Sequence, residues 1–207
     1  QMHALWVTDE GGNQSTCAFF TVIQDNGPYC EFGVIVVQGM IMTEEDEGVA
    51  DVNLELSGGL FFETTDTDGT YEFESLPPDN YWLFPFLDED HTNGVSTYDM
   101  VLIRQHILSI HKLDSPYKII AADVNNSGSI STLDLVELQL LILGVNSGFE
   151  SNTSWRFIDA AYEFPNPDDP WEEIFPEGVG LNAGLPFYEI DFIGVKIGDV
   201  NNSAVPN

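Results

Sequence analysis

The chain has 207 residues, of which 35 are acidic and five are basic, and its formal net charge is −30. Nucleic acids and anionic membranes are bound through Lys and Arg, so this balance argues against both as partners. Hydrophobic residues make up 43% of the chain and aromatic residues 12%, which is too apolar for a protein that stays unfolded. We therefore expect a folded acidic protein that binds cations, because cations relieve the repulsion between its carboxylates.

The sequence has the features of a secreted protein. No apolar run reaches the length of a membrane span, so membrane insertion is not expected. No signal peptide opens the chain, and we expect a mature protein that is extracellular or at the cell surface. Cys17 and Cys30 are compatible with one disulfide bond in an oxidising compartment, and the twelve residues between them suit a hairpin staple. Two buried free thiols are the alternative.

Residues 1–32 are predicted to form a β-hairpin. A strand over residues 4–8, a turn over 9–13 and a second strand over 16–23 follow one another. Residues 6–17 (Trp-Val-Thr-Asp-Glu-Gly-Gly-Asn-Gln-Ser-Thr-Cys) resemble the last hairpin of hyalin-repeat modules, which are immunoglobulin-like modules of secreted proteins. Two strands alone are only marginally stable in water. We therefore expect this hairpin to dock on the rest of the chain or to donate strands to a neighbouring molecule.

Residues 33–87 are predicted to form a small β-sandwich. Candidate strands cover residues 34–42, 48–58, 71–76 and 81–86, and two of them alternate apolar and polar side chains. Hairpin turns are expected at residues 66–69 (Asp-Thr-Asp-Gly) and 77–80 (Pro-Pro-Asp-Asn). The segment resembles the immunoglobulin-like sandwich of carboxypeptidase-regulatory-like, or CnaB-type, modules. The resemblance implies a rigid spacer, and glycan binding through Tyr71, Tyr81 and Trp82 is a weaker alternative.

A calcium-binding loop is predicted at residues 123–134. Oxygen-bearing side chains occupy its positions 1, 3, 5 and 12, and Gly128 stands at position 6. A twelve-residue loop of this kind can wrap one Ca²⁺ ion with roughly six to eight oxygen atoms. The loop also opens an apolar helix predicted over residues 134–143, whose positive end favours a carboxylate. A solvated polar turn is the alternative. The predicted ligands are the side chains of Asp123, Asn125, Ser127 and Asp134 and the carbonyl of Ser129.

A second loop lies 35 residues earlier, at residues 88–99. Its segment Ser-Thr-Tyr-Asp at 96–99 falls in register with Ser-Thr-Leu-Asp at 131–134, and a helix is predicted over residues 99–109. Position 6 is Asn93, and asparagine is the residue type that tolerates a positive φ best after glycine. The predicted ligands are Asp88, Asp90, Thr92, the carbonyl of Gly94, and Asp99.

The two loops together resemble the duplicated calcium motif of dockerin domains over residues 88–144. Each loop closes on an aspartate, whereas an EF-hand closes on a glutamate, and neither loop has an entering helix. The resemblance implies Ca²⁺ as the cofactor and a cohesin-like module as a partner. Dockerins of cellulase complexes often carry a Ser-Thr recognition pair directly before the last ligand. In this chain the pairs at 96–97 and 131–132 stand one place earlier.

The remainder of the chain is predicted to be irregular over residues 145–188, which are rich in proline and aromatic residues. The carboxylates of this stretch are interpreted as a solvated face: Asp168, Asp169, Glu172 and Glu173. Residues 189–198 alternate like a strand, and residues 199–203 then repeat residues 123–127 letter for letter. This is half a calcium loop. Asp199, Asn201 and Ser203 are therefore candidate ligands of a third site, which another segment or subunit would complete; a coincidental turn is the alternative.

Residues 88–207 as a whole resemble the C-terminal dockerin-like region of very large secreted surface proteins of Bacteroidetes-type bacteria. The segments that carry the resemblance are residues 93–99, 113–125, 152–157 and 195–201. The resemblance implies an architecture and no known catalytic activity. The predicted organisation thus has three parts, which are residues 1–32, 33–87 and 88–207.

No arrangement typical of an enzyme is found in the sequence. No Gly-rich phosphate loop is present. The four histidines show no metal-ligand spacing: His3, His91, His106 and His111. We predict a non-enzymatic, mainly β protein with a small helical part. Our first hypothesis is a calcium-stabilised subunit of an extracellular filament, a homopolymer joined by β-strand donation. The alternative is a binding module that anchors a secreted protein to a cohesin-like or cell-surface receptor.

Overall fold

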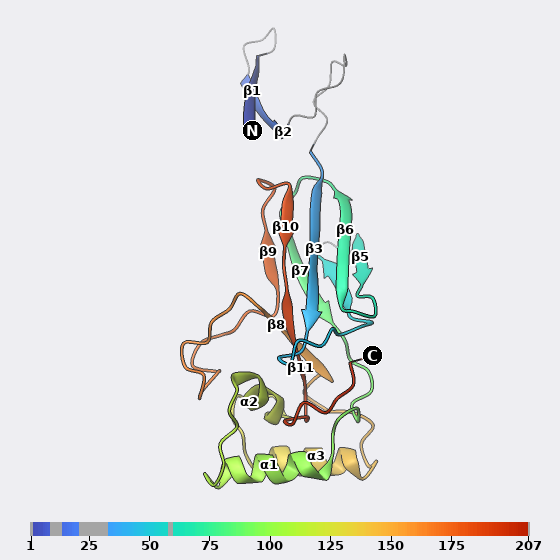
Figure 1. The fold of residues 1–207 in the computed structure, drawn as a ribbon, viewed down its shortest axis with the longest axis vertical. Helices are drawn as coiled ribbons and strands as arrows, with labels where there is room; N and C mark the ends of the chain where they lie inside the picture. The colour runs from blue at the N-terminus through green and yellow to red at the C-terminus, as the bar shows by residue number, and fades with distance from the viewer. Residues whose placement is uncertain (1, 9–13, 21–32, 58–59, 207) are drawn as a thin grey trace.

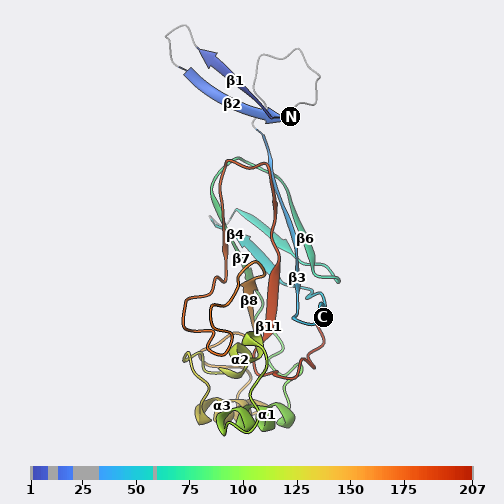
Figure 2. The ribbon, with the colours of Figure 1, turned by 60° about the vertical axis from the view of Figure 1, so that its left-hand side comes forward.

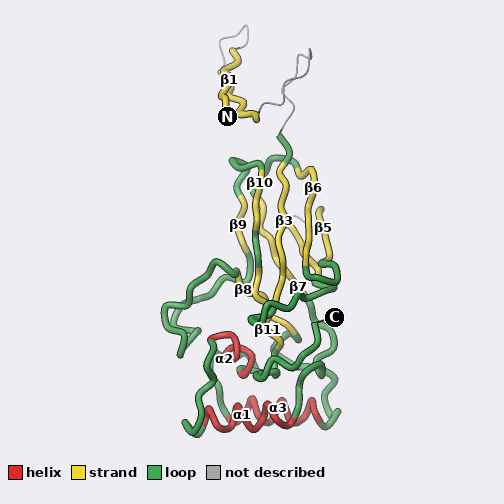
Figure 3. The backbone as a smooth tube through the Cα atoms, in the orientation of Figure 1, coloured by secondary structure: helices red, strands yellow, loops and turns green. Residues whose placement is uncertain are grey.

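A computed structural model describes residues 2–8, 14–20, 33–57 and 60–206. The chain forms a two-stranded hairpin, a five-stranded sheet and a four-stranded sheet. The two larger sheets lie one over the other, and the three helices gather at one end of them (Figures 1 and 3). None of the described helices is long and apolar enough to cross a membrane.

The N-terminal hairpin is present as predicted. Strand β1 (Met2–Thr8) pairs antiparallel with β2 (Gln14–Phe20), with Leu5 opposite Cys17. Within the described part of the chain, neither strand pairs with a strand of the larger sheets. The predicted disulfide between Cys17 and Cys30 lies outside the described residues and stays a prediction.

Strand β3 (Ile35–Met42) is the centre of the five-stranded sheet. It pairs antiparallel with β6 (Thr70–Leu76) on one side. On its other side it pairs in parallel, first with β10 (Phe187–Glu189) and then with β11 (Phe192–Lys196). Strand β8 (Trp155–Asp159) completes the sheet antiparallel to β11. Residues 35–42 and residues 187–196, which are far apart in the sequence, therefore meet in one sheet.

The four-stranded sheet is antiparallel throughout. Its order is β5 (Phe61–Thr64), β4 (Asn53–Leu56), β7 (Tyr81–Phe86) and β9 (Val179–Leu181). Leu54 and Leu56 of β4 are completely buried while Glu55 between them is exposed, as the pleat of a half-buried strand requires. Inward residues of both sheets share one core, which contains Val37, Phe73 and Leu83. The prediction of a mainly β sandwich with a small helical part is confirmed.

The two predicted hairpin turns connect different sheets. The turn at residues 66–69 joins β5 of one sheet to β6 of the other, and residues 77–80 join β6 to β7. Gly69 has a φ of 81°, which the first turn needs. The turns were therefore predicted at the right residues, but the strands that they connect do not pair with each other. Which strands pair depends on which faces are buried in the core.

Residues 145–188 contain strands that the sequence did not indicate. Strands β8 and β9 lie in this stretch, and β9 has only three residues. The predicted strand over residues 189–198 is divided into β10 and β11 by Ile190 and Asp191. At this break the Asp191 carboxylate accepts a hydrogen bond of 2.8 Å from the Met40 amide, and a Cβ at Gly39 would lie 1.7 Å from the Ile190 carbonyl oxygen. The predicted boundary at residue 87 therefore falls within shared sheets.

The helical end holds a second core. Helix α1 (Thr97–Ile107) and helix α3 (Thr132–Ile142) are the two predicted helices, and each begins two residues before its predicted start. Helix α2 (Pro116–Ala122) was not predicted; Ser115 caps it and Pro116 occupies its first turn. The core of this end includes Ile103 of α1, Ile120 of α2 and Leu138 of α3, together with Val195 of β11. Strand β11 thus contributes to the packing of both ends.

Phe192 lies at this junction and is completely buried. Phe192→Ala is expected to reduce the free energy of unfolding by about 3–5 kcal/mol, because the substitution would leave a cavity in the core that residues of both sheets share. Phe62→Ala is the matched control, since Phe62 is 61% exposed on β5, and its effect is expected to stay within about 0.5 kcal/mol. Urea denaturation at saturating calcium measures both, and equal effects would contradict the placement of Phe192 in the core.

Candidate metal centres

The loop at residues 123–134 brings two buried carboxylates together. Asp123 accepts hydrogen bonds from the backbone amides of Ser127 and Gly128, both at 2.8 Å. Asp134 accepts one from the Asn125 amide at 3.1 Å. Both aspartates are completely inaccessible to solvent. The loop therefore folds around its first and last carboxylates, as an oxygen cage for one ion requires.

The neutral oxygens of the same loop fit a hard cation. The side-chain oxygen Oδ1 of Asn125 is buried and has no hydrogen-bond partner. The Ser127 hydroxyl donates a hydrogen bond of 3.1 Å to the Ser129 carbonyl, so both of these oxygens lie on the same side of the loop. A buried amide oxygen without a partner is costly, and a cation would satisfy it. The donor set of carboxylate, amide, hydroxyl and carbonyl oxygens is the set that Ca²⁺ prefers.

The electrostatics of the loop also favour a cation. Burial raises the pKa of the Asp123 carboxyl, with the charge of Asp134 as a smaller cause. None of the ion pairs among the described residues involves either aspartate. Two buried carboxylates without a counter-charge repel each other, and a divalent cation between them removes this penalty.

Asp134 has a second function, at the start of α3. Its other carboxylate oxygen accepts hydrogen bonds from the backbone amide of Ser131 at 2.7 Å and from the Ser131 hydroxyl at 3.1 Å. Ser131 is the N-cap of α3, and the two residues form a capping box. A capping box at Ser96 and Asp99 begins α1 in the same way. In each Ser-Thr pair of the sequence, the serine is therefore the N-cap and the threonine is the first residue of the helix.

The first loop is arranged differently from the second. Asp88 accepts a hydrogen bond from the Ser154 amide at 2.8 Å, and its carboxylate lies 3.1 Å from Nε2 of His91, whose pKa is lowered by burial. Thr92 donates to Asp90 at 3.0 Å in an exposed position. None of these hydrogen bonds involves Asp99. The assignment of Asp88, Asp90 and Thr92 as ligands stays a prediction, and these contacts do not support it.

Asp99 instead lies beside the C-terminal segment. It is completely buried and accepts a hydrogen bond of 3.0 Å from the Val200 amide. Asp199 is almost completely buried, and burial raises the pKa of its carboxyl. Lys196 lies close enough to Asp199 to interact with its charge, but burial lowers the pKa of this lysine to about 8. The candidate ligands at residues 199–203 and the last ligand of the first loop are thus together.

Each of these arrangements relies on few charged groups. Among the residues that the structure describes, no three carboxylate, imidazole or thiol groups converge in a metal-binding arrangement. A site here consists of two carboxylates and several neutral oxygens. Such a composition is typical of calcium rather than of zinc, which prefers Cys and His.

The outer face of the helical end carries an apolar groove between α1 and α3. Its volume is about 690 Å³, and the sequence analysis did not anticipate it. Ten of its eleven lining residues are five pairs that stand 35 positions apart, at equivalent places of the repeat: Thr97 and Thr132, Met100 and Leu135, Arg104 and Gln139, Ile107 and Ile142, and Leu108 and Leu143. Val101, the eleventh lining residue, and its counterpart Val136 are 47% and 50% exposed.

The candidate glycan-binding residues do not form one surface. Tyr71 and Tyr81 are buried, and their hydroxyls donate to the carbonyls of Ile190 and Pro77. Trp82 is exposed and stacks on Phe84 with ring centroids 6.1 Å apart. Of the three predicted aromatic side chains, Trp82 alone is therefore accessible to a ligand.

Part of the chain, including the helical end, is similar to a known family. Residues 88–143 match the family model of the dockerin type I domain. The match covers both helices of the groove and the loop at residues 123–134, and it ends before β8. Dockerin type I domains bind calcium and are binding modules without catalysis, and they occur in extracellular or cell-surface proteins. No curated protein matches the chain.

Asp134→Asn is expected to remove one bound Ca²⁺, because the substitution takes away one of two buried charges while it preserves the shape of the capping side chain. Calorimetric titration with Ca²⁺ measures the number of ions bound. Glu163→Gln is the control, since Glu163 is exposed and lies outside residues 88–143. Full stoichiometry in Asp134→Asn would contradict the ligand assignment.

Calcium removal is expected to lower the melting temperature sharply. A ligand at a hundredfold excess over its Kd stabilises the folded state by about 2.7 kcal/mol per site, which is large beside the total stability of about 5–15 kcal/mol. Differential scanning calorimetry with and without EDTA measures the shift. An unchanged melting curve after chelation of calcium-loaded protein would refute a stabilising function of the ions.

Proposed function

We propose that the chain is a calcium-dependent binding module whose α1–α3 groove docks on a cohesin-like module. The observation that carries this proposal is the apolar groove, which equivalent residues of the two repeats line. An exposed apolar patch of this kind on a very acidic protein marks an interaction site. The dockerin match covers the same helices and supports a cohesin as the partner.

The groove has the composition of a protein interface. Its centre is aliphatic, with Met100, Leu135 and Ile142. Arg104 lies on the lining, and arginine is enriched in residues that dominate binding energy. Tyr98 lies in the first turn of α1 and is 58% exposed, and Leu133 occupies the equivalent place on α3. A partner with a complementary apolar surface would bury these side chains.

Calcium dependence follows from where the helices begin. Asp99 and Asp134 close the candidate metal centres and also cap α1 and α3. Loss of the ions would leave two buried carboxylates without compensation and would loosen the first turns of both helices. The groove between these helices would then lose its shape. Binding to the partner is therefore expected to require calcium.

The β-sandwich supplies a rigid support for this module. Helix α2 packs on β11, and the Gly198 amide at the end of that strand donates a hydrogen bond of 2.8 Å to the Ala121 carbonyl. The anchored protein would be held at a fixed orientation to the groove. The dockerin match supports this anchoring function rather than the filament subunit, and a homopolymer joined by the β1–β2 hairpin stays a hypothesis without support.

Val101→Asp and Val136→Asp test the groove. Each is expected to weaken binding to immobilised type I cohesin modules at least about tenfold, because a charge would be buried at the apolar interface. The melting temperature is expected to stay unchanged, since both side chains are half exposed. Surface plasmon resonance measures the affinity at saturating calcium and again with EDTA, which is expected to abolish binding.

Ile174→Asp is the matched control, because Ile174 is 98% exposed and lies outside the helical groove. It introduces the same charge at an apolar surface position. Equal loss of affinity in all three variants would assign the effect to net charge. Absence of calcium-dependent binding across a panel of cohesin modules would refute the proposed partner.

A further inference from the structure

We propose that one calcium site of this protein is split between two distant segments. Asp199, Asn201 and Ser203 supply its first half, and the Gly94 carbonyl and Asp99 supply its second half. The two segments are about a hundred positions apart in the chain, since Val200 and Asp99 are separated by 101. The site would thus be an ordinary twelve-residue calcium loop whose backbone is interrupted at its middle.

The first carboxylate of the split site is held as in the continuous loop. Asp199 accepts a hydrogen bond of 2.6 Å from the Ala204 amide, five residues later. Asp123 accepts one of 2.8 Å from the Gly128 amide, also five residues later. Asn202 has a φ of 55° and Asn126 a φ of 54°, so the backbones turn at the same position of both loops.

The carbonyl ligand is in the equivalent place, although it comes from the other segment. The Ser203 hydroxyl donates a hydrogen bond of 2.9 Å to the Gly94 carbonyl. In the continuous loop the Ser127 hydroxyl donates one of 3.1 Å to the Ser129 carbonyl. Gly94 and Ser129 each stand five residues before their closing aspartate. The interruption therefore falls between positions 6 and 7 of the loop.

The closing carboxylate is also bound in the same way. One oxygen of Asp99 accepts from the Ser96 amide at 2.9 Å, and the other accepts from the Val200 amide at 3.0 Å. Asp134 likewise uses one oxygen for its helix cap and the other for an amide near the start of its loop. The C-terminal segment thus takes the place that residues 88–92 would have in a continuous first loop.

Burial gives independent evidence for a ligand. Among the described residues, four buried side-chain nitrogen or oxygen atoms lack a hydrogen-bond partner, and two of these are the Oδ1 atoms of Asn125 and Asn201. Both asparagines stand at position 3 of their loops. The four buried acidic residues of the described chain are divided equally between the two sites: Asp123 and Asp134, and Asp99 and Asp199. Each site thus combines two buried charges with one unsatisfied amide oxygen, and a single Ca²⁺ would satisfy all three groups.

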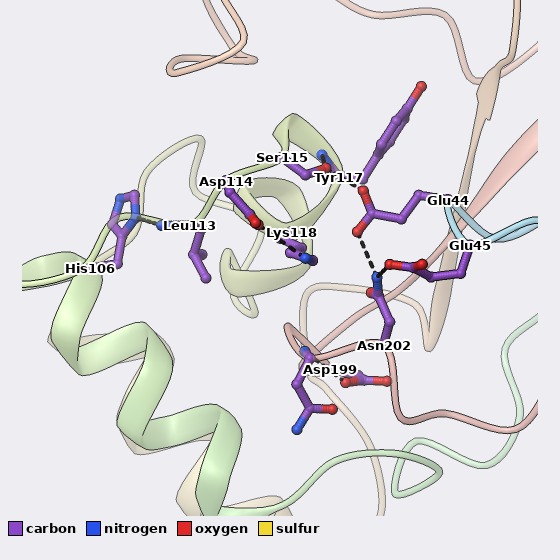
Figure 4. A network of polar contacts seen from close by, with 11 residues as sticks. Glu44, Glu45, His106, Leu113, Asp114, Ser115, Tyr117, Lys118, Asp199 and Asn202 are labelled. Atoms are coloured by element: carbon purple, nitrogen blue, oxygen red, sulfur yellow. Dashed lines mark hydrogen bonds and ion pairs between the residues drawn. The ribbon is translucent and has the colours of Figure 1, made fainter.

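Specific contacts hold the two segments together. Asn93, which replaces the glycine of the continuous loop, forms two hydrogen bonds with the backbone of Val205, at 2.8 and 3.1 Å. Gly94 has a φ of 74°, and a Cβ there would lie 2.6 Å from the Asp199 carboxylate. The Asn202 side chain donates hydrogen bonds of 2.9 Å to both Glu44 and Glu45 (Figure 4). The C-terminal segment is therefore held by Asn93, by the close approach of Gly94, and by Glu44 and Glu45.

The experiment counts calcium ions in variants of the full chain. Native mass spectrometry and calorimetric titration with Ca²⁺ are expected to give two ions for the unmodified protein. Asp199→Asn is expected to bind one ion, and Asp199→Asn combined with Asp134→Asn none. Asp90→Asn is the matched control, because Asp90 belongs to the contiguous first loop and the split site does not use it. This control is expected to bind two ions.

Two ions bound by Asp199→Asn with unchanged affinity would overturn the proposal, and so would the loss of one ion from Asp90→Asn. Three ions in the unmodified protein would also overturn it, because the half loop would then belong to a separate site. Circular dichroism at saturating calcium checks the fold of each variant. If Asp199→Asn does not fold, Asn201→Ala replaces it. This variant is expected to bind one of the two Ca²⁺ ions at least tenfold more weakly than the unmodified protein does. Unchanged affinities for both ions would refute the site. These counts need no cohesin, so they are independent of the proposed partner.

Discussion

The structure of the helical end depends on the burial of the carboxylates Asp99 and Asp134. Each is completely buried, and each uses its oxygens both to begin a helix and to close a ring of oxygen atoms. An ionised carboxylate is tolerated in such a position only if hydrogen bonds and a counter-charge compensate for lost hydration. The hydrogen bonds are present, and a cation would supply the charge. Ion binding at these two side chains would therefore be coupled to the position of both helices and to the shape of the groove.

This coupling extends to the β-sandwich through the C-terminal segment. Strand β11 contributes residues to both cores and leads directly into Gly198 and Asp199. In the split site that we propose, one half would follow the end of β11 and the other half would lie at the start of α1. An ion between them would join the sandwich to the helical end at the place where the helices meet the sheets (Figure 2). A partner bound at the groove would be held at a fixed orientation to the strands.

The net charge of −30 has two parts with different physical consequences. Among the acidic residues that the structure describes, all but four are at least partly exposed, where water and salt screen them. Four of the described carboxylates are buried, at the two candidate sites. Water and salt screen these four much less, so a cation bound beside them would compensate their charge more effectively than ionic strength does. The surface acidity and the buried carboxylates therefore differ in the kind of counter-charge that they call for.

Local patterns of the sequence were sufficient to predict the elements that local interactions determine. The helices α1 and α3, the turn at residues 66–69 and the conformation of the loop at residues 123–134 all follow from capping residues, glycine positions and oxygen spacing within twelve residues. The two helices begin two residues earlier than predicted, because Ser96 and Ser131 form their N-caps. Helix α2 and β9 were missed, since seven and three residues are too few to show a period.

The sequence by itself determined that the protein is a mainly β chain with a dockerin-like region and that residues 199–203 repeat the letters of residues 123–127. It could not assign the partner of that half loop, because a repeat of letters carries no information about contacts a hundred residues away. Only the tertiary structure decided this. The parallel pairing of β10 and β11 with β3 returns the chain to the start of α1, and there Asp199 meets Asp99 rather than Asp88. Strand order in the sheet, rather than position in the sequence, determines which oxygens lie together at this candidate site.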